Sequence, residues 1–407
     1  MSGEAVCPFS ALRGRKLHLG VCGSVAAYKA AEVMRHLQKL GVSVSVTLTE
    51  AGARFVTPLT FEALGATQVY TRMFGQDEGA LFGHLLPGQI ADAFVIAPAT
   101  ATTLARLAAG LADDMLAAQA LAFSGPLVLA PAMNPRMWSN PATQQNISLL
   151  RQRGAAIVQP LSGTVACGDS GEGKLAEISE ICLAAAAALL PKDMAGKVVL
   201  LTLGPTREQW DGVRVWTNLS TGRMGAALAQ AAYLRGASVH ALAGPGVPSL
   251  PEGVQRHDVV SARQMFAKAQ ELWPMADIGI FTAAVADFSP NPFGPDKFKK
   301  STVGERMSID FLPNPDILAN LASKAAPHQR LLGFAAETDN LAEQVHEKLR
   351  RKQVHLLAGN LVGQPDSGFA SQTNSMFVLD HAGREESWPT MSKADVAWRL
   401  LDWLLTL

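Results

Sequence analysis

The sequence predicts two α/β domains in series, each built on a doubly wound, mainly parallel sheet. Short apolar runs alternate with helical patterns along the whole chain, as they do where helical crossovers join parallel strands. The alternation stops at a short polar segment, Pro191–Gly196, and then starts again. At roughly 150 residues per domain, 407 residues allow two or three cores. We therefore expect domains at residues 1–192 and 193–407.

In the first half, five apolar runs of strand length are separated by helical stretches. The expected strands are Lys16–Gly23, Val42–Thr49, Ala93–Ala99, Pro126–Met133 and Ala155–Gln159. The expected helices lie near Ala26–Leu40, Ala101–Ala109, Pro141–Arg153 and Ala176–Leu190. Five strands with helical crossovers indicate a flavodoxin-like sheet.

The second half repeats the pattern with a second parallel set. Its expected strands are Lys197–Leu203, Ser238–Ala243, Ile278–Ala283, Leu331–Ala335 and Val354–Ala358. Its expected helices lie near Gly225–Arg235, Ala262–Leu272, Pro315–Ala325, Leu341–Arg351 and Lys393–Leu405. We predict a Rossmann-like domain there.

Composition narrows the class of protein. Lys and Arg number 35 and so do Asp and Glu, so no net charge recruits nucleic acid or an anionic membrane. Charged residues make up 17% and hydrophobic residues 48%, which excludes a disordered chain. The apolar stretch Ile181–Leu190 falls short of the roughly 20 residues that span a bilayer. With no secretory signal pattern and four cysteines that form no disulfide framework, we expect a cytoplasmic protein.

Ligands of such sheets bind beyond the carboxyl ends of the strands, and the segments there are rich in Gly, Ala and Thr. Gly20–Lys29 is a strand that ends in a glycine turn before a helix, which suits a phosphate. Pro98–Thr103 and Pro131–Asn134 follow the third and fourth strands in the same way. Small residues at these points let a flat ring or a phosphate approach the backbone.

Eleven motifs, in this order, resemble one known family. In the first half they are GVCGSVAAYK (20–29), LTEAGARFVTP (48–58), APATATTLARLAAGLADD (97–114), PAMNPRMW (131–138) and ACGDSGEGKL (166–175). In the second half they are GPTRE (204–208), TNLSTGRMG (217–225), AAVADF (283–288), KFKK (297–300), NPDIL (314–318) and GFAAET (333–338). Together they resemble the bifunctional phosphopantothenoylcysteine decarboxylase/phosphopantothenate–cysteine ligase family of coenzyme A biosynthesis.

For the first half, the resemblance implies FMN and decarboxylation of a cysteinyl group through oxidation and re-reduction of its thiol. The implied cofactor-binding residues are Gly23, Ser24, Val25, Thr49 and Thr100. The implied catalytic residues are His84, which takes the thiol proton, Asn134, which binds the departing carboxylate, and Cys167, which donates the final proton. The glycine-rich loop around Cys167 is expected to act as a lid, whereas Cys22 and Cys182 are expected to be structural.

For the second half, the resemblance implies that CTP activates 4'-phosphopantothenate as an acyl-cytidylate, from which cysteine displaces CMP. The implied catalytic residues are Asn218, at the pantothenoyl group, and Lys297, at the triphosphate. Asp287 is expected to lie at the end of a strand, near CTP and its Mg²⁺. The remaining implied nucleotide-binding residues are Ala283, Pro315, Asp316, Ile317, Leu318, Phe334, Lys348 and Lys352.

Two other functions stay open on the sequence alone. One is a flavoprotein cysteine decarboxylase of different specificity, and the other is a non-enzymatic flavin-binding regulatory subunit. His84, Asn134 and Cys167 argue against the second, and the motifs of the second half argue against the first. The resemblance also implies a homo-oligomer, with trimers of the first domain assembled into a dodecamer and dimers of the second.

Overall fold

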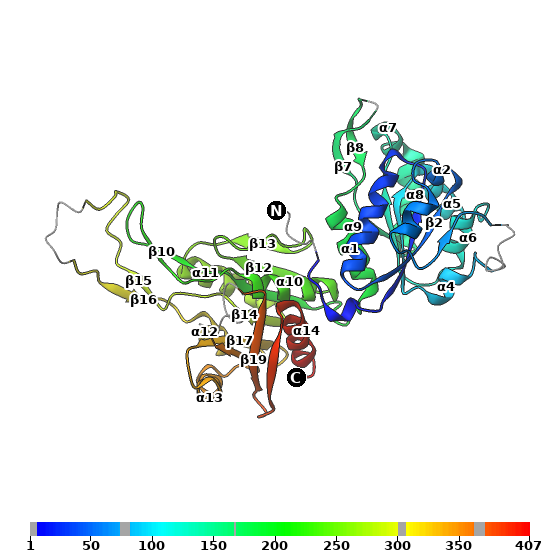
Figure 1. Ribbon diagram of the computed structural model, residues 1–407. Helices are drawn as coiled ribbons and strands as arrows, with labels where there is room; N and C mark the ends of the chain where they lie inside the picture. The colour runs from blue at the N-terminus through cyan, green and yellow to red at the C-terminus, as the bar shows by residue number, and fades with distance from the viewer. Residues whose placement is uncertain (1–5, 74–81, 167, 300–306, 362–370) are drawn as a thin grey trace. The chain divides into compact units, whose positions relative to one another are not determined.

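The computed structural model describes residues 6–73, 82–166, 168–299, 307–361 and 371–407. By its internal contacts the chain divides into two compact units, Met1–Pro191 and Lys192–Leu407. Each unit holds a sheet with helices on both faces (Figure 1). Within the described ranges, no helix is long and apolar enough to cross a membrane.

The sheet of the first unit has six parallel strands in the order β3-β2-β1-β4-β5-β6. Their bounds are β1 Lys16–Val21, β2 Ser43–Leu48, β3 Val69–Tyr70, β4 Ala93–Ala99, β5 Leu127–Pro131 and β6 Ala156–Ile157. Without the two-residue edge strand β3, the five predicted strands run 2-1-3-4-5. That is the flavodoxin-like order, so the predicted fold is confirmed.

Helices cover both faces of this sheet (Figure 1). One face carries α1 Lys29–Lys39 and α9 Ile178–Leu189, and the other carries α5 Ala101–Ala109, α6 Met115–Ala122 and α8 Pro141–Gln152. Shorter helices are η1 Ser10–Leu12, η2 Val25–Tyr28, α2 Glu50–Ala53, α3 Pro58–Ala63, α4 Leu86–Ile90 and α7 Pro135–Trp138. An antiparallel hairpin of β7 Leu161–Thr164 and β8 Ser170–Lys174 stands apart from the sheet.

The sheet of the second unit has eight strands in the order β13-β12-β9-β14-β17-β18-β19-β20. The first six are parallel in the Rossmann order 3-2-1-4-5-6, as predicted, and an antiparallel pair closes the edge. Bounds are β9 Val198–Leu203, β12 Ser238–Ala243, β13 Gln255–Asp258, β14 Ile278–Phe281, β17 Arg330–Glu337, β18 Leu356–Leu361, β19 Thr373–Asp380 and β20 Glu385–Ser392.

The helices of this unit again lie on two faces. One face carries α10 Arg223–Leu234 and α14 Lys393–Leu404, and the other carries α11 Ala262–Leu272, α12 Ile317–Ala322 and α13 Leu341–Lys352; η3 Trp273–Met275 follows α11. Two small antiparallel pairs, β10 Arg207–Gln209 with β11 Val215–Thr217 and β15 Phe288–Pro290 with β16 Phe311–Pro313, extend from the sheet as an arm (Figure 1).

Arg235 fastens three segments of the second unit. Its guanidinium is only 2% exposed and donates to both carboxylate oxygens of Asp193, at 2.8 and 2.6 Å. It also pairs with Asp402 of α14 at 2.7 Å and lies 4.8 Å from the ring centre of Trp398. Removing one partner of a buried ion pair is costly, because it leaves the opposite charge without its partner.

We expect Arg235→Met to lower the free energy of unfolding of the second unit by about 2–4 kcal/mol, since both acids would lose their partner. The hydrogen bond from Arg235 holds the pKa of Asp193 below its ordinary value. The pair therefore stabilises the fold above the ordinary carboxyl range and loses its effect as the pH falls, a loss that the variant should not show. Urea unfolding at pH 7 and pH 3.5 measures both effects.

Candidate functional site

Three hydroxyl side chains begin helices at the carboxyl edge of the first sheet. Ser24 follows β1, Thr49 follows β2 and Thr100 follows β4. Each caps the next helix by accepting a hydrogen bond from a backbone N–H, at 3.3, 3.0 and 3.4 Å respectively. Parallel strands end at one edge, so the fold brings these predicted residues together.

Gly23 allows two of these turns to meet. A Cβ atom at this position would lie 2.4 Å from the Cβ of Ala51, so any larger residue would push the first turn away from α2. Glycine is therefore required by the packing of this turn against Ala51, and its predicted place at a phosphate stays a prediction.

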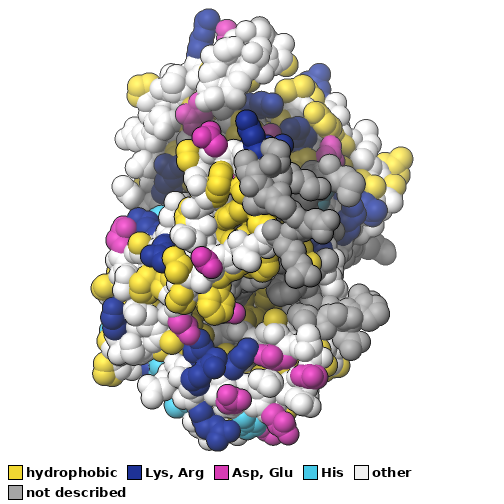
Figure 2. Space-filling view, turned by 90° about the vertical axis from the view of Figure 1, so that its left-hand side faces the viewer, with side chains coloured by type: hydrophobic (Ala, Val, Ile, Leu, Met, Phe, Trp, Pro, Cys, Tyr) yellow, Lys and Arg dark blue, Asp and Glu magenta, His cyan; other side chains and the backbone are white. Residues whose placement is uncertain are grey.

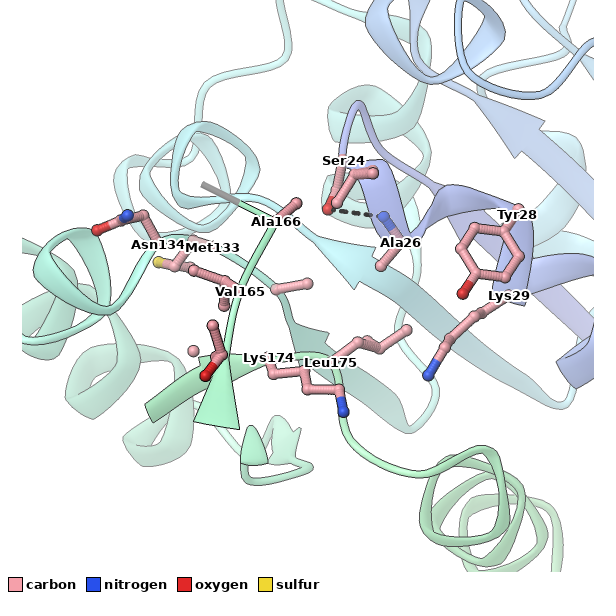
Figure 3. A pocket seen from close by; sticks show the side chains of 14 residues that line it. Ser24, Ala26, Tyr28, Lys29, Met133, Asn134, Val165, Ala166, Lys174 and Leu175 are labelled. Atoms are coloured by element: carbon pink, nitrogen blue, oxygen red, sulfur yellow. Dashed lines mark hydrogen bonds between the residues drawn. The ribbon is translucent and has the colours of Figure 1, made fainter. Parts of the chain in front are cut away.

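Two adjoining cavities open at this edge. One, of about 690 Å³, is lined by Gly23, Ser24, Thr49 and Thr100 among others. The second, of about 440 Å³, is lined by Ser24, Val25 and Asn134 and by residues of the β7–β8 hairpin (Figure 3). All five predicted cofactor-binding residues thus line one space or the other. The sequence did not indicate Tyr28, Lys29 and Lys174 for the second cavity, or Arg54 and Arg106 for the first.

Asn134 connects the second cavity to the hairpin. Its Oδ1 accepts from the N–H of Arg136 at 2.8 Å, and its Nδ2 donates to Asp169 Oδ2 at 2.7 Å. In Figure 3 the amide points away from Ser24 and Tyr28. Asp169 therefore competes with a carboxylate in the cavity for the Asn134 amide, whose Nδ2 carries two hydrogens.

Only glycine fits the hairpin where it crosses the start of α7. A Cβ on Gly173 would lie 2.5 Å from the carbonyl oxygen of Met133, whose N–H donates to the Gly173 carbonyl at 2.9 Å. This contact places Ala166 on the wall of the second cavity. Its neighbour Cys167 lies outside the described residues.

His84 is half-buried and lines neither cavity. A hydrogen bond from a buried side chain holds the peptide bond between Gly83 and His84: the Gln119 side chain donates to the Gly83 carbonyl at 2.9 Å. Gln119 Oε1 in turn accepts from Thr47 at 2.6 Å and lies 3.2 Å from His18 Nε2. Burial lowers the pKa of His18 to about 3, so its ring stays neutral within this network. The sequence did not indicate this network.

Cys22 and Cys182 are structural, as predicted. Both are buried, and burial raises the pKa of the Cys22 thiol to about 11 and that of Cys182 to about 12. Neither thiol is a nucleophile near neutral pH.

In the second unit, Asn218 lies beside the AAVADF segment. Its Nδ2 donates to the carbonyls of Ala284 and Val285, at 3.3 and 3.2 Å, next to the predicted Ala283. Asp287 requires a correction. It does not end β14, which stops at Phe281, but is an exposed residue directly before β15; the segment between the two strands includes an isolated bridge of Ala284 with Pro205.

The NPDIL segment forms the start of α12. Asp316 caps that helix by accepting from the Ala319 N–H at 3.0 Å and forms an ion pair with Lys352. Burial raises the pKa of Asp316, but the hydrogen bonds from Lys352 and Ala319 outweigh it and lower the pKa overall. Lys348 pairs with Glu337 at the end of β17. The structure thus gathers two predicted lysines and the predicted aspartate at one end of α12 and α13.

Three of the predicted nonpolar residues belong to or pack against one core under α12, and a fourth lies on β17. Ile317 is buried in the core under α12, and Ala283 and Leu318 pack against the same core. Phe334, on β17, lies one residue beyond Gly333, where an added Cβ would be 2.8 Å from Leu318. Lys297 lies elsewhere along the chain, exposed in the segment between β15 and β16.

Comparisons with known proteins cover both units. A family model described as "Flavoprotein" matches residues 9–190, and one described as "DNA/pantothenate metabolism flavoprotein C-terminal domain" matches residues 194–407. Among solved structures, the C-terminal domain of a coenzyme A biosynthesis bifunctional protein CoaBC is 32% identical over 52% of this chain and 96% of that one, with a TM-score of 0.45. The FMN-dependent cysteine decarboxylase SpaF is 34% identical over 43% of this chain and 99% of its own, with a TM-score of 0.37.

Curated relatives match the whole chain. The coenzyme A biosynthesis bifunctional protein CoaBC of Vibrio vulnificus is 38% identical over 97% of this chain and 98% of its own length. That of Bacillus subtilis is 39% identical over 97% and 98%. Matched along almost its full length by such relatives, and by a family model on each unit, the chain belongs to the CoaBC family of bifunctional coenzyme A biosynthesis enzymes.

Proposed function

We propose that the chain joins 4'-phosphopantothenate to cysteine with CTP and then decarboxylates the product to 4'-phosphopantetheine with FMN. The observation that carries this proposal is the match to CoaBC proteins over 97% of the chain, which includes both units. Residues 1–192 would carry the decarboxylase and residues 193–407 the ligase. The family models, which match residues 9–190 and 194–407, support this division.

The first unit offers a fitting place for FMN. The combination of capping hydroxyls, a glycine turn and an open cavity of about 690 Å³ suits a phosphate with an attached ring system. We assign Gly23, Ser24, Val25, Thr49 and Thr100 to it. Bound there, FMN would supply the oxidation and re-reduction of the substrate thiol.

The chain's own residues would handle the carboxylate and the protons. Asn134 would release Asp169 and hold the departing carboxylate through a neutral amide, which does not stabilise the ground state as strongly as a cation does. His84 would take the thiol proton, because an imidazole nitrogen can act as a general base. Cys167 would return a proton to the carbon that loses carbon dioxide.

In the second unit, Lys297 would meet the triphosphate, and Lys348 and Lys352 would leave their acidic partners for phosphate oxygens. Asn218 would orient the pantothenoyl group, and Ala283 with Pro315–Leu318 and Phe334 would enclose the cytidine. Asp287 would contact Mg²⁺ bound to CTP. No cluster of three acidic, His or Cys side chains occurs within the described ranges, and a single carboxylate with phosphate oxygens is a common Mg²⁺ arrangement.

Assembly into a homo-oligomer is part of the proposal. Figure 2 looks onto the side of the second unit from which its arm projects and shows hydrophobic side chains gathered there. Side chains on the arm and its flanks that are more than 40% exposed include Val213, Val215, Trp216, Leu219, Phe288, Phe293 and Leu312. A patch of this kind is typical of a subunit interface. It supports self-association of this unit. The trimer-based dodecamer and the cytoplasmic location are proposed from the family resemblance alone.

The direct test incubates the purified chain with 4'-phosphopantothenate, cysteine and CTP and follows the products by mass. We expect CMP, pyrophosphate and phosphopantothenoylcysteine, followed by loss of carbon dioxide, and flavin absorbance near 450 nm. Decarboxylation of other cysteinyl compounds without ligation would instead favour a decarboxylase of different specificity. Flavin binding without either reaction would favour a regulatory subunit.

A fragment that ends at Pro191 tests the division of labour. A parallel sheet with helices on both faces has its own core, so we expect this fragment to fold, bind FMN and decarboxylate supplied phosphopantothenoylcysteine at a rate within about threefold of the full chain. Circular dichroism, absorbance and product mass measure the three properties. A fragment that is unfolded or colourless would show that the two units depend on each other.

A further inference from the structure

Asp211 is a buried carboxylate with an unusually complete set of donors. It lies in the turn between β10 and β11, and its side chain is 0% exposed. Its Oδ1 accepts from the backbone N–H groups of Val213 and Arg214, at 2.8 and 2.6 Å. Its Oδ2 accepts from Arg214 Nη1 at 2.6 Å and from the N–H of Phe298 at 3.0 Å. The last of these bonds joins the turn to a segment 87 residues away.

The Phe298 N–H belongs to the peptide bond between Lys297 and Phe298. The hydrogen bond that it donates to Asp211 therefore fixes the backbone next to Lys297, the proposed triphosphate contact. Burial raises the pKa of Asp211, but the hydrogen bonds from Val213, Arg214 and Phe298 outweigh it and keep the pKa below its ordinary value. The carboxylate is therefore ionised near neutral pH, and in this form both of its oxygens can accept hydrogen bonds.

Further contacts tie the same two segments together. The Phe293 N–H donates to the Trp210 carbonyl at 2.7 Å. The Trp210 ring centre lies 5.1 Å from that of Phe298 and 6.0 Å from that of Phe293. A Cβ on Gly212 would lie 2.1 Å from the Pro295 carbonyl oxygen, so glycine is needed for this approach. Lys297 itself remains exposed on a segment held on both sides.

We propose that Asp211 is a positioning residue of the ligase, which aims Lys297 at the triphosphate by holding the Phe298 peptide. The inference rests on the proposed function, because it takes Lys297 as the triphosphate contact. A lysine on a loose segment must be ordered at each encounter with the nucleotide, whereas one on an anchored segment is already in place. Asp211 would do this without touching CTP.

Asp211→Asn tests this role. An amide of the same shape can keep its oxygen on the Val213 and Arg214 N–H groups, but its NH₂ group then faces both Arg214 Nη1 and the N–H of Phe298, donor against donor. We expect kcat/KM for CTP to fall about tenfold, with KM for 4'-phosphopantothenate and cysteine within twofold of wild type. Trypsin should cut faster after Lys297 and Lys299. Glu271→Gln, which removes an exposed ion pair with Lys268 on α11, is the matched control and should change neither readout.

The decisive comparison is a double-mutant cycle with Lys297→Gln. If Asp211 acts through Lys297, adding Asp211→Asn to Lys297→Gln should change kcat/KM for CTP by less than twofold. Equal tenfold losses in both backgrounds would overturn the inference while leaving the proposed function intact. Ligation at the wild-type rate by Lys297→Gln alone would overturn the inference and the assignment of Lys297 to the triphosphate, whereas loss of the ligase activity in the wild-type chain would overturn the proposed function.

Phe298→Leu provides a second route if Asp211→Asn folds poorly, as a lowered melting temperature would show. It keeps the Phe298 N–H but removes the ring that packs on Trp210, so it should also raise trypsin cleavage and weaken use of CTP about threefold. Unchanged cleavage and unchanged kinetics in this variant would overturn the anchoring role.

Discussion

Replacing Cys167 by serine is expected to stop the decarboxylase after the loss of carbon dioxide. A thiol ionises near pH 8.5, whereas an alkyl hydroxyl is a far weaker acid and does not readily supply the last proton. The unsaturated enethiol product should therefore accumulate, and formation of 4'-phosphopantetheine should fall by at least a factor of 10³. Product mass after a single turnover measures this directly.

Structural features around Cys167 make this result specific. Ala166, the residue before Cys167, lines the same cavity as Ser24 and Asn134. The β7–β8 hairpin packs against Met133 through the close approach of Gly173. Flavin absorbance and ligation should therefore match wild type in the variant. Cys7→Ser makes the same chemical change on the segment before β1 and should leave both reactions unchanged. Normal turnover by Cys167→Ser would remove this thiol from the mechanism.

The sequence predicted helices best where their ends are chemically marked. The bounds of α5 and α11 were predicted to the residue, because Thr100 and the Ser261–Gln264 capping box begin them and Gly110, with φ of +70°, ends α5. The central strands of each main sheet were predicted because both of their faces are apolar. These signals are local and need no knowledge of the fold.

Edge elements lacked such signals. The sequence of β13 is Gln-Arg-His-Asp, with three of its four side chains exposed, so no apolar run indicates a strand. Neither strand of the antiparallel pair β19 and β20 was predicted, and β20 is polar along much of its length. Pairing to a neighbour, which stabilises such strands, depends on a sheet that is already built.

The same division applies to the candidate site. Ser24 and Thr100 lie in segments that the sequence placed after strands, whereas Thr49 was implied by the family resemblance; the role of all three at a phosphate stays a prediction. Asp211 and Gln119 could not, since each acts on a peptide distant in sequence, at Phe298 and at Gly83. Ordinary polar residues in a turn or an Ala-rich helix carry no sign of such partners.

Lys297→Gln is the second large effect we expect, and it falls on the ligase alone. Glutamine keeps a hydrogen-bond donor on a side chain one bond shorter but removes the charge that would meet the triphosphate. A hydrogen bond to a charged group contributes about 1.5–3 kcal/mol, and each 1.4 kcal/mol is tenfold in rate. Formation of the acyl-cytidylate should therefore slow by about ten- to 150-fold.

The loss should grow as negative charge shifts to the leaving pyrophosphate, so kcat should fall along with kcat/KM for CTP. Rapid-quench measurement of pyrophosphate release checks this step. Decarboxylation of supplied phosphopantothenoylcysteine should be unchanged, because Lys297 belongs to the other unit. Lys324→Gln removes an equally exposed charge just after α12 and should leave both reactions as they are. If Lys297→Gln ligates at the wild-type rate, the 297–300 segment is a solvated basic turn and the triphosphate binds elsewhere.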